Sequence, residues 1–234
     1  MELTFASYNI RKAIGLDRRR DPDRILAILR EIDADVVALQ EADRRFGRRA
    51  SALPLASIES HTHYKPVPFG GPPESIGWHG NALLVRRDIV VAESAVVNLP
   101  TIEPRGAVRA DLVAGGRRLR VVGMHLDLSG LRRRQQVRSI LHHVAQCEKH
   151  LPAVLMGDLN EWARHGGSLG EFAQNWRVLA AGRSFPSRRP VAQLDRIVAS
   201  PEWRIAGCGV HHSALASRGS DHLPVVARLE LPKF

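Results

Sequence analysis

The chain has 234 residues, a formal net charge of +10, 44% hydrophobic residues and 25% charged residues. These values are ordinary for a globular protein with a sizeable core, so we expect a single domain over residues 1–234. No stretch approaches the ~18 apolar residues needed to cross a bilayer, and residues 1–10 lack the pattern of a secretory signal, so a cytoplasmic location is the default expectation.

Apolar runs of strand length recur along the chain, at residues 3–10, 35–40, 82–85, 89–99, 119–124, 153–156, 194–199 and 223–231. Helical patterns lie between some of them. Asp21 is a good N-cap, Pro22 suits the first helical position, and apolar residues then repeat on one face up to Ile32. Further helices are predicted over residues 131–149 and 168–176. Because strands outnumber helices without regular alternation, the pattern indicates two packed β-sheets with helices outside.

The basic residues and the cysteines give weaker signals. Among the 34 basic residues, the only lysines are Lys12, Lys65, Lys149 and Lys233. A GC-rich coding sequence explains this excess of arginine as readily as an anion site does, so charge alone favours nucleic acid or an anionic membrane only weakly. The two cysteines, Cys147 and Cys208, lie far apart, and we expect small buried groups there rather than a disulfide or a zinc site.

Side chains capable of metal binding or proton transfer recur at the ends of the predicted strands. They are Asn9, Glu41, Asn81, His125, Asp158, Asn160, Asp195, Asp221 and His222. A packed strand fixes the backbone while the polar head reaches the edge, which is how a rigid scaffold presents ligands and bases. The pattern therefore predicts a catalytic or metal-binding site at the edge of the sheets.

Taken singly, several of these residues have ordinary structural explanations. An asparagine can satisfy a loop backbone, a glutamate can be a solvated charge, a histidine can belong to the core, and Asp195 with Arg196 can form a surface ion pair. Two motifs are harder to dismiss. The sequence Gly-Asp-Leu-Asn ending at Asn160 points two oxygen-bearing side chains the same way. The sequence Ser-Asp-His ending at His222 sets a potential metal ligand beside a proton carrier.

Several blocks in a fixed order carry a resemblance to a known family. They are Leu39-Gln40-Glu41, Gly80-Asn81-Ala82, Gly157-Asp158-Leu159-Asn160, Leu194-Asp195-Arg196-Ile197 and Ser220-Asp221-His222. With Asn9 they resemble the endonuclease/exonuclease/phosphatase superfamily, which has the fold of pancreatic deoxyribonuclease, exonuclease III-type abasic endonucleases, inositol polyphosphate 5-phosphatases and neutral sphingomyelinases. Small bacterial members look most similar. The resemblance implies a four-layer α/β sandwich of two packed mixed β-sheets flanked by helices.

The resemblance also implies a role for each residue. The metal ligands would be Asn9, Glu41 and Asp221, holding Mg²⁺ with Mn²⁺ as a possible substitute. The chemical step would use His125, Asp158, Asn160, Asp195 and His222, with Asp158 and Asn160 orienting the attacking water and Asp195 holding His222. Substrate contacts would come from Asn81 and Arg105, with Arg109 as an alternative arginine.

We therefore predict a divalent-metal-dependent phosphoesterase that cleaves a phosphodiester by direct attack of water. No Gly-x-Ser-x-Gly motif or activated cysteine offers a protein nucleophile. DNA or RNA is the first expected substrate, because His125 matches a histidine of the deoxyribonuclease branch, although the same histidine occurs in the sphingomyelinase branch. A phospholipid at an anionic membrane surface, or an inositol or sugar phosphate, is the alternative, and an inactive binding module of the same fold is a third possibility. No obligate protein partner is evident.

Two regions leave the substrate side open. Residues 59–80 contain several candidates for substrate contacts, namely Tyr64, Glu74, Trp78 and His79. Basic residues also lie close to the motifs in sequence, and these are Arg11, Lys12, Arg18, Arg19, Arg20, Arg44, Arg45, Arg48, Arg49, Arg132, Arg133, Arg134, Arg164 and Arg218. If the motifs share one rim, these side chains would make it positive. The alternative is an evenly charged surface.

Overall fold

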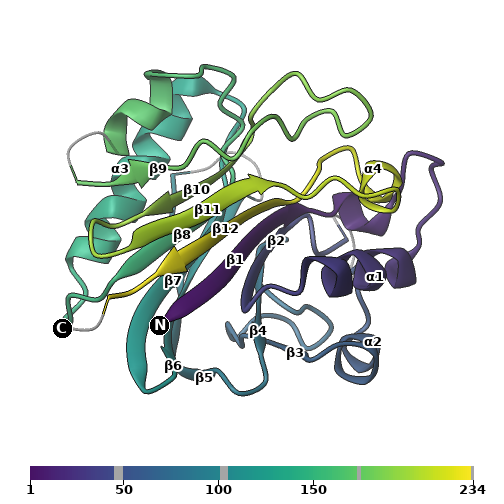
Figure 1. The fold of residues 1–234 in the computed structure, drawn as a ribbon, viewed down its shortest axis with the longest axis horizontal. Coiled ribbons are helices and arrows are strands. Elements are labelled where there is room, and N and C mark those ends of the chain that lie inside the picture. The colour runs from purple at the N-terminus through teal and green to yellow at the C-terminus, as the bar shows by residue number, and fades with distance from the viewer. Residues whose placement is uncertain (45–49, 101–104, 173–174, 233–234) are drawn as a thin grey trace.

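The structure is a computed structural model and describes residues 1–44, 50–100, 105–172 and 175–232. In this part of the chain two six-stranded sheets pack face to face (Figure 1). The first has the order β11 (Arg204–Val210), β12 (Val225–Glu230), β1 (Glu2–Asn9), β2 (Val36–Gln40), β4 (Ala82–Arg86) and β3 (Tyr64–Pro66). The second has the order β5 (Val90–Val97), β6 (Gly106–Ala114), β7 (Arg117–His125), β8 (Ala153–Asp158), β10 (Asp195–Ala199) and β9 (Arg177–Val178).

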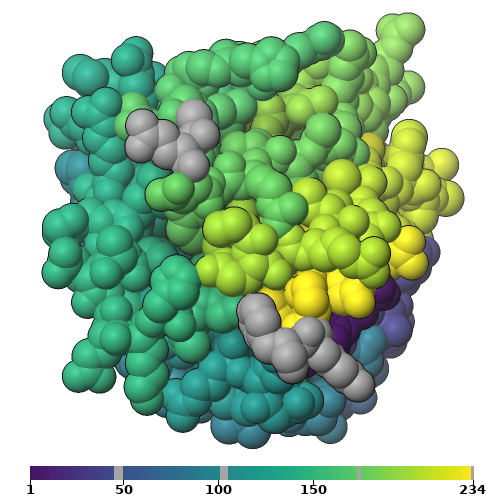
Figure 2. Space-filling view, turned by 60° about the vertical axis from the view of Figure 1, so that its left-hand side comes forward, coloured from purple at the N-terminus to yellow at the C-terminus, as the bar shows by residue number. Residues whose placement is uncertain are grey.

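Helices cover the outer face of each sheet. On the first sheet lie α1 (Pro22–Ile32), α2 (Leu55–His61), α4 (Ala216–Gly219) and the short 3-10 helix η1 (Arg11–Ala13). On the second lie α3 (Gly130–Ala145) and the 3-10 helix η2 (Gly167–Phe172). Figure 2 brings the side with α3 forward: teal and green residues form much of this face, and the yellow C-terminal residues lie below them. The expected α/β sandwich of two mixed, helix-flanked sheets is confirmed.

Three apolar clusters separate these layers. The central one joins the two sheets and includes Phe5, Val121, Met156 and Trp203, all essentially inaccessible to solvent. A second lies between the first sheet and its helices, and a third lies under α3 and η2. Burial of apolar surface on both faces of each sheet is the main driving force that holds the layers together. It also fixes the strand ends from which the polar residues extend.

One parallel pair of strands in each sheet decides where the polar residues meet. Strand β1 runs parallel to β2, with Asn9 opposite Gln40, and β7 runs parallel to β8, with His125 opposite Asp158. Carboxyl ends of parallel neighbours lie at the same edge of a sheet. The antiparallel strand β10 then places Asp195 opposite Asp158. The register therefore gathers strand-end residues that are distant in sequence.

Helix α1 forms as the sequence predicts. The side chain of Asp21 accepts a hydrogen bond from the backbone N–H of Arg24 at 3.0 Å, and Pro22 opens the helix. The buried face carries Ile25 and Leu29, among others, and Asp33 ends the helix in a left-handed conformation.

Other elements differ from the sequence prediction. Strands β3, β6, β9 and β11 and helix α2 were not predicted. Helix α3 ends at Ala145 rather than at residue 149. Beyond its last turn, Arg120 donates hydrogen bonds to the carbonyls of Val144 and Lys149. The segment predicted as a helix over residues 168–176 is a 3-10 helix that ends at Phe172, and residues 173 and 174 lie outside the described part.

The expectation that both cysteines are buried is wrong. Cys147 follows α3 and is half-buried, and Cys208 is exposed on the edge strand β11; both are free thiols. Among the described residues, no helix has the length and apolarity needed to cross a membrane.

Candidate active site

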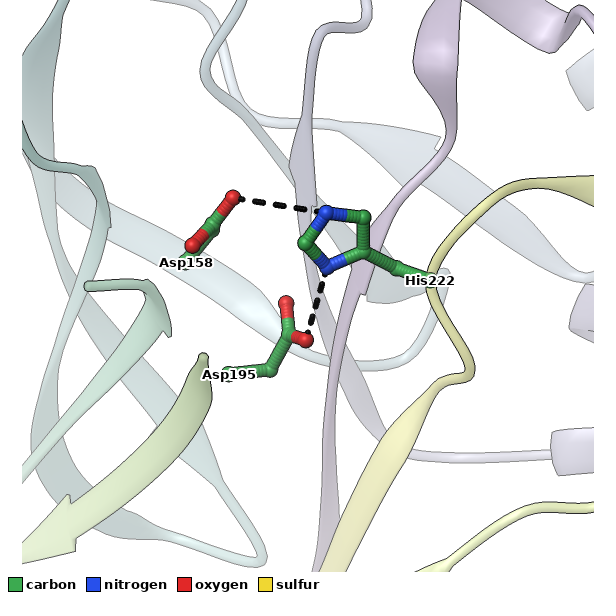
Figure 3. Close-up of side chains that lie close together, drawn as sticks. All are labelled: Asp158, Asp195 and His222. Carbon is green, nitrogen blue, oxygen red and sulfur yellow. Dashed lines mark hydrogen bonds and ion pairs between the residues drawn. The ribbon is translucent and has the colours of Figure 1, made fainter. Parts of the chain in front are cut away.

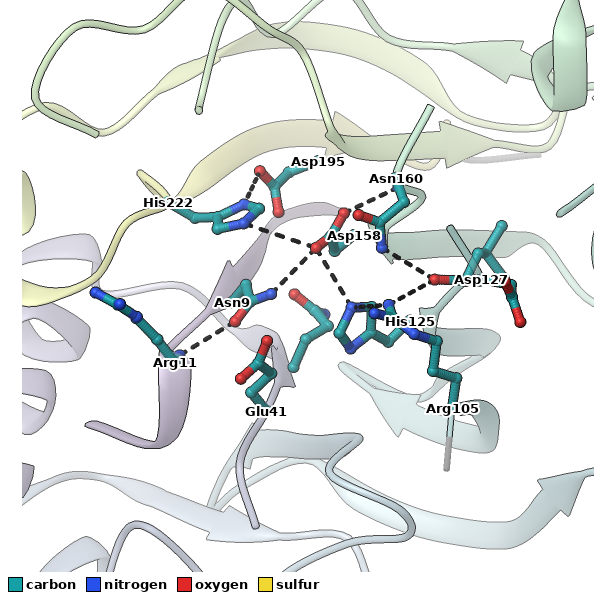
Figure 4. Close-up of polar contacts among 12 residues, drawn as sticks. Asn9, Arg11, Glu41, Arg105, His125, Asp127, Asp158, Asn160, Asp195 and His222 are labelled. Carbon is teal, nitrogen blue, oxygen red and sulfur yellow. Dashed lines mark hydrogen bonds and ion pairs between the residues drawn. The ribbon is translucent and has the colours of Figure 1, made fainter. Parts of the chain in front are cut away.

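Asp158 lies at the centre of a buried polar cluster at the carboxyl ends of the parallel strands (Figure 4). Its Oδ2 atom accepts a hydrogen bond from Nδ2 of Asn9 at 3.1 Å. The same oxygen lies 3.4 Å from Nε2 of His125 and 3.8 Å from Nε2 of His222. One carboxylate oxygen thus faces side chains from β1, from β7 and from the segment before β12. Because Asp158 is only 1% exposed, it is held by these neighbours rather than by bulk water.

Asp195 and His222 form a carboxylate–imidazole pair (Figure 3). Nδ1 of His222 lies 2.9 Å from Oδ2 of Asp195, and Ser184 donates its hydroxyl to the same oxygen at 2.5 Å. This contact directs Nε2 of His222 toward Asp158. Asp195 is therefore not half of a surface ion pair: Arg196 is also buried and donates to the backbone carbonyl of Asp195. A carboxylate on one ring nitrogen fixes the orientation of the other.

The two histidines of the cluster have opposite charge preferences. Burial alone would lower the pKa of His222, but the negative charges of Asp195, Asp158 and Asp221 outweigh it and raise this pKa to about 10. Burial dominates at His125 and, with the positive charge of Arg105, lowers its pKa to about 4. At neutral pH, His222 is therefore a cation and His125 is neutral. A pair of groups with separated pKa values is typical of a site with distinct acid and base roles.

Glu41 lies on the opposite side of Asn9 from His222, and its carboxylate forms an ion pair with Lys12. It directly follows β2 and has a φ of 53°, a left-handed conformation that non-glycine residues adopt rarely. Burial opposes its ionisation, but the hydrogen bond from Lys12, together with the positive charge of that lysine, outweighs burial, and the pKa of Glu41 is lowered. Its carboxylate is thus negative and faces the cluster.

Asp221 is the second carboxylate on this side. Its Oδ2 lies 3.5 Å from Nε of Arg11, and its side chain keeps about a third of its surface exposed. The oxygens of Asp221, Glu41 and Asn9 form the kind of hard donor set that suits Mg²⁺ or Mn²⁺. Each of the two carboxylates already has a cationic partner from the turn that follows β1. These carboxylates could hold a metal ion, which would share them with Arg11 and Lys12 or displace these two side chains.

Asn160 and Arg105 frame the cluster on the side of β7. The backbone N–H of Asn160 donates to Oδ1 of Asp158 at 2.9 Å, and its side-chain amide donates to the carbonyl of Leu126 at 2.9 Å. Nη1 of Arg105 lies 2.5 Å from Nε2 of His125 and 2.7 Å from the same carbonyl of Leu126. The expected arginine therefore lies beside the cluster.

Asn81 is buried at 1% exposure with both amide atoms unpartnered within the described part of the chain. It precedes β4 in a loop that is anchored by Asp43, which accepts hydrogen bonds from the backbone of Gly80 and the hydroxyl of Ser75. Leaving a buried amide unpaired costs free energy. A rigidly held, unpartnered amide is a suitable contact for a substrate oxygen.

Arg109 is not brought into the cluster. It is buried on β6 and forms ion pairs with Glu93 and with Asp111, the latter at 3.0 Å. The candidates in residues 59–80 also have other contacts. The hydroxyl of Tyr64 donates to the carbonyl of Ala34 in the core, and the rings of Trp78 and His79 stack with centroids 5.0 Å apart. Glu74 is exposed, and its backbone carbonyl accepts from Ser51.

Comparison with known proteins decides the family. The model of the endonuclease/exonuclease/phosphatase family matches residues 6–222, nearly the whole chain. The chain belongs to the endonuclease/exonuclease/phosphatase family.

Relatives and solved structures agree with this assignment. The chain is similar to uncharacterized protein YbhP of Escherichia coli K12, with 27% identity over 96% of this chain and 95% of YbhP. It has the fold of D. rerio TDP2, whose structure contains a single-strand DNA product, with a TM-score of 0.74, 17% identity, and 98% and 99% coverage. It also has the fold of a mannosyl-6-phosphatase from Bacteroides thetaiotaomicron, with a TM-score of 0.75, 21% identity, and 97% and 99% coverage.

Two side chains of this family member were not assigned to the site from sequence. Ser184 supports Asp195, but it lies in a loop far from any motif, so no sequence pattern indicates it. Lys12 was noted only as a nearby charge, yet it contacts Glu41 directly. Its position three residues after Asn9 is the one available signal. The turn of Arg11, Lys12 and Ala13 has positive φ at each residue, which no propensity predicts.

Proposed function

We propose that this chain is a single catalytic domain, a divalent-metal-dependent phosphoesterase that cleaves a phosphodiester by direct attack of water. The observation that carries the proposal is the arrangement of Asp195, His222 and Asp158. In it, one carboxylate orients a cationic imidazole toward a second, buried carboxylate. A positioned cation and a positioned base are what hydrolysis of a phosphate ester requires.

The metal ligands in this proposal are Glu41, Asp221 and Asn9. A bound Mg²⁺ or Mn²⁺ would neutralise charge that develops on the phosphoryl oxygens. A competing group is Asp158, Asp195 and His222, which offer donor atoms within 4.8 Å of one another. Hydrogen bonding argues against that group, because Nδ1 of His222 and the hydroxyl of Ser184 both already contact Oδ2 of Asp195.

Isothermal titration calorimetry of metal-stripped protein with Mn²⁺ distinguishes the two assignments. Glu41→Gln should weaken Mn²⁺ binding at least tenfold, whereas Asp195→Asn should leave it within about twofold. The reverse order of effects would show that the metal binds to Asp158, Asp195 and His222 instead. Far-UV circular dichroism of both variants serves as the control for folding.

The attacking water would lie against Asp158 and Asn160. Asp158 is well placed to orient the water, because Nδ2 of Asn9 holds its Oδ2 and the backbone N–H of Asn160 holds its Oδ1. His222, as a cation, would donate a hydrogen bond to the phosphoryl group, while neutral His125 and Arg105 would contact another of its oxygens. Asn81 offers an amide without a partner in the described residues for the same purpose.

Nucleic acid is the substrate that we propose. The ring centroids of Phe185 and His222 are 4.8 Å apart, and those of Trp162 and Phe185 are 6.1 Å apart. Trp162 is 62% exposed. Exposed aromatic rings beside a phosphate site are suited to stacking against bases. The related fold of D. rerio TDP2 with a single-strand DNA product is compatible with this substrate.

A phospholipid remains the second candidate because of two other side chains. Leu128 and Leu131 follow His125 in sequence and are 63% and 65% exposed. Apolar side chains at a rim favour contact with a lipid surface. A sugar phosphate is a further option within this fold, as the mannosyl-6-phosphatase illustrates.

Parallel assays on one preparation separate these substrates. Wild-type protein with Mg²⁺ or Mn²⁺ should nick supercoiled plasmid, and His222→Ala from the same purification should not. Trp162→Ala should reduce nicking several-fold, with Leu128→Ala as the matched control that leaves it unchanged. Absence of nicking at low salt, together with release of a phospholipid headgroup that depends on Leu128, would favour a phospholipid substrate over nucleic acid.

A further inference from the structure

Arg109 faces a part of the protein that is separate from the candidate active site. On the ladder between β6 and β7, Arg109 pairs with Val122, whereas Gly106 pairs with His125, so Arg109 lies about 10 Å further along the strand. Val122 packs in the cluster under α3. Side chains alternate between the faces of a strand, so Arg109 lies on the α3 side and His125 on the side of the other sheet.

A cavity of about 380 Å³ lies beside Arg109, between strands β5 to β7 and the end of α3. Its lining contains three carboxylates and more cationic groups, namely Arg109, Arg118, Arg120 and Lys149. The imidazole of His143 also lines it, and burial together with the charges of Arg109 and Arg120 lowers the pKa of this histidine. The four cationic groups outnumber the three carboxylates, so the lining of the cavity carries a net positive charge.

The buried charges in this region are unbalanced. Arg109 and Arg120 are 4% and 2% exposed, yet Asp111 is the one buried carboxylate among the described residues that contacts them. Arg120 binds both of its oxygens, at 2.7 and 2.8 Å. Nη1 of Arg109 pairs with Asp111 at 3.0 Å, but Nε of Arg109 makes no hydrogen bond within the described chain. A buried guanidinium with unused donors is costly unless another group satisfies it.

Glu93 is the other partner of Arg109, and it is held loosely. Its side chain is 63% exposed, and it lies next to a register shift in the pairing of β5 with β6. Bulges of this kind re-aim a side chain. A mostly exposed carboxylate gains little from its ion pair and can leave it at small cost.

We propose that this cavity is a second anion site, which binds a small molecule through a phosphate group that replaces Glu93 on Arg109. Phosphate is favoured over a carboxylate because the incoming group must exceed the single charge of Glu93 and can use several guanidinium donors at once. The volume exceeds that of inorganic phosphate, so a small organic phosphate also fits.

The signal of the Arg109 Nε–H in nitrogen-15 NMR spectra tests this site directly. It is assigned by its loss in Arg109→Lys. Titration with inorganic phosphate should shift this signal, and Glu93→Gln should raise the affinity about fivefold, because one competing negative charge is removed. Adenosine monophosphate, titrated in parallel, shows whether the cavity accepts an organic phosphate or inorganic phosphate alone.

Exposed variants keep the test independent of core packing. Arg118→Gln and Lys149→Gln should each weaken phosphate binding several-fold, whereas Arg228→Gln, an exposed arginine on β12, should not. Equal affinity in wild type and Glu93→Gln would overturn the proposal. So would phosphate-induced shifts confined to the surroundings of His222.

Discussion

At the scale of single residues, the pairing of Asp195 with His222 determines the charge of the site. The imidazole is buried, and burial by itself would favour its neutral form. Contact with Asp195 at 2.9 Å and proximity to Asp158 reverse that preference. In the proposed mechanism, Asp195 therefore acts through His222 rather than on the substrate.

A double-mutant cycle tests this dependence. His222→Ala should lower kcat by about a thousandfold or more, and Asp195→Asn should lower it by a similar factor. The double variant should lose little more than either single variant, because both changes remove one function. Steady-state kinetics on a phosphodiester substrate give the three ratios. Losses that multiply fully would show that the two residues act independently.

The raised pKa of His222 also predicts a pH dependence of stability. The proton binds more tightly in the folded chain, so this contribution is fully present below the ordinary pKa of 6.5 and disappears as pH rises through about 10. Urea unfolding should show that wild type loses more stability than His222→Gln between pH 7 and pH 10. Parallel profiles for the two proteins would contradict the pairing.

At His125 the sign is opposite: its contribution is present above pH 6.5 and is lost as pH falls through about 4.

At the scale of elements, the sequence predicts best the strands that end in the site. Strands β1, β2, β7, β8 and β10 each contain a mostly apolar stretch, and most of their residues are buried between layers. Strand β6 was not predicted because charged Arg109 and Asp111 interrupt its apolar pattern, and β11 because it is an exposed edge strand with two glycines. In both, tertiary contacts override the local signal.

In the candidate site too, some residues were predicted from sequence motifs, whereas others depend on tertiary contacts. Asn9 and Asp158 each end a strand and His222 precedes one, and the three meet because the core fixes the register of these strands. Arg109 was a weaker alternative, and sequence alone cannot tell which face of β6 it occupies. The support from Ser184 depends on a loop conformation that no motif specifies.

Close packing of β7 against β8 gives a prediction at this scale. A Cβ atom on Gly157 would lie 1.8 Å from the carbonyl oxygen of Met124, so Gly157→Ala must separate the strands that carry His125 and Asp158. We expect a loss of about 3 kcal/mol in the free energy of unfolding. Gly209→Ala is the matched control, because no heavy atom lies within 4 Å of its added Cβ, and it should change stability by less than about 0.5 kcal/mol. Equal effects in urea unfolding would refute the packing argument.

At the scale of the whole molecule, contacts in the candidate site and in the core account for only part of the net charge of +10. Arg11 and Lys12 reach carboxylates of the candidate site, whereas Arg133 is buried and pairs with Glu161. Several of the other residues noted near motifs are exposed, including Arg134, Arg164 and Arg218. Arg45, Arg48 and Arg49 lie outside the described residues. A positive rim around the site therefore stays a prediction.

The most direct test of the account is the metal dependence of phosphodiester hydrolysis. Metal-stripped protein should not hydrolyse bis(4-nitrophenyl) phosphate, and Mg²⁺ or Mn²⁺ should restore the rate, because in the proposed mechanism Glu41, Asp221 and Asn9 would hold a cation that acts on the phosphoryl group. Glu41→Gln should require much more metal, and His222→Ala should stay inactive at saturating metal. An undiminished rate after verified removal of metal, or an unchanged rate in His222→Ala, would contradict the account.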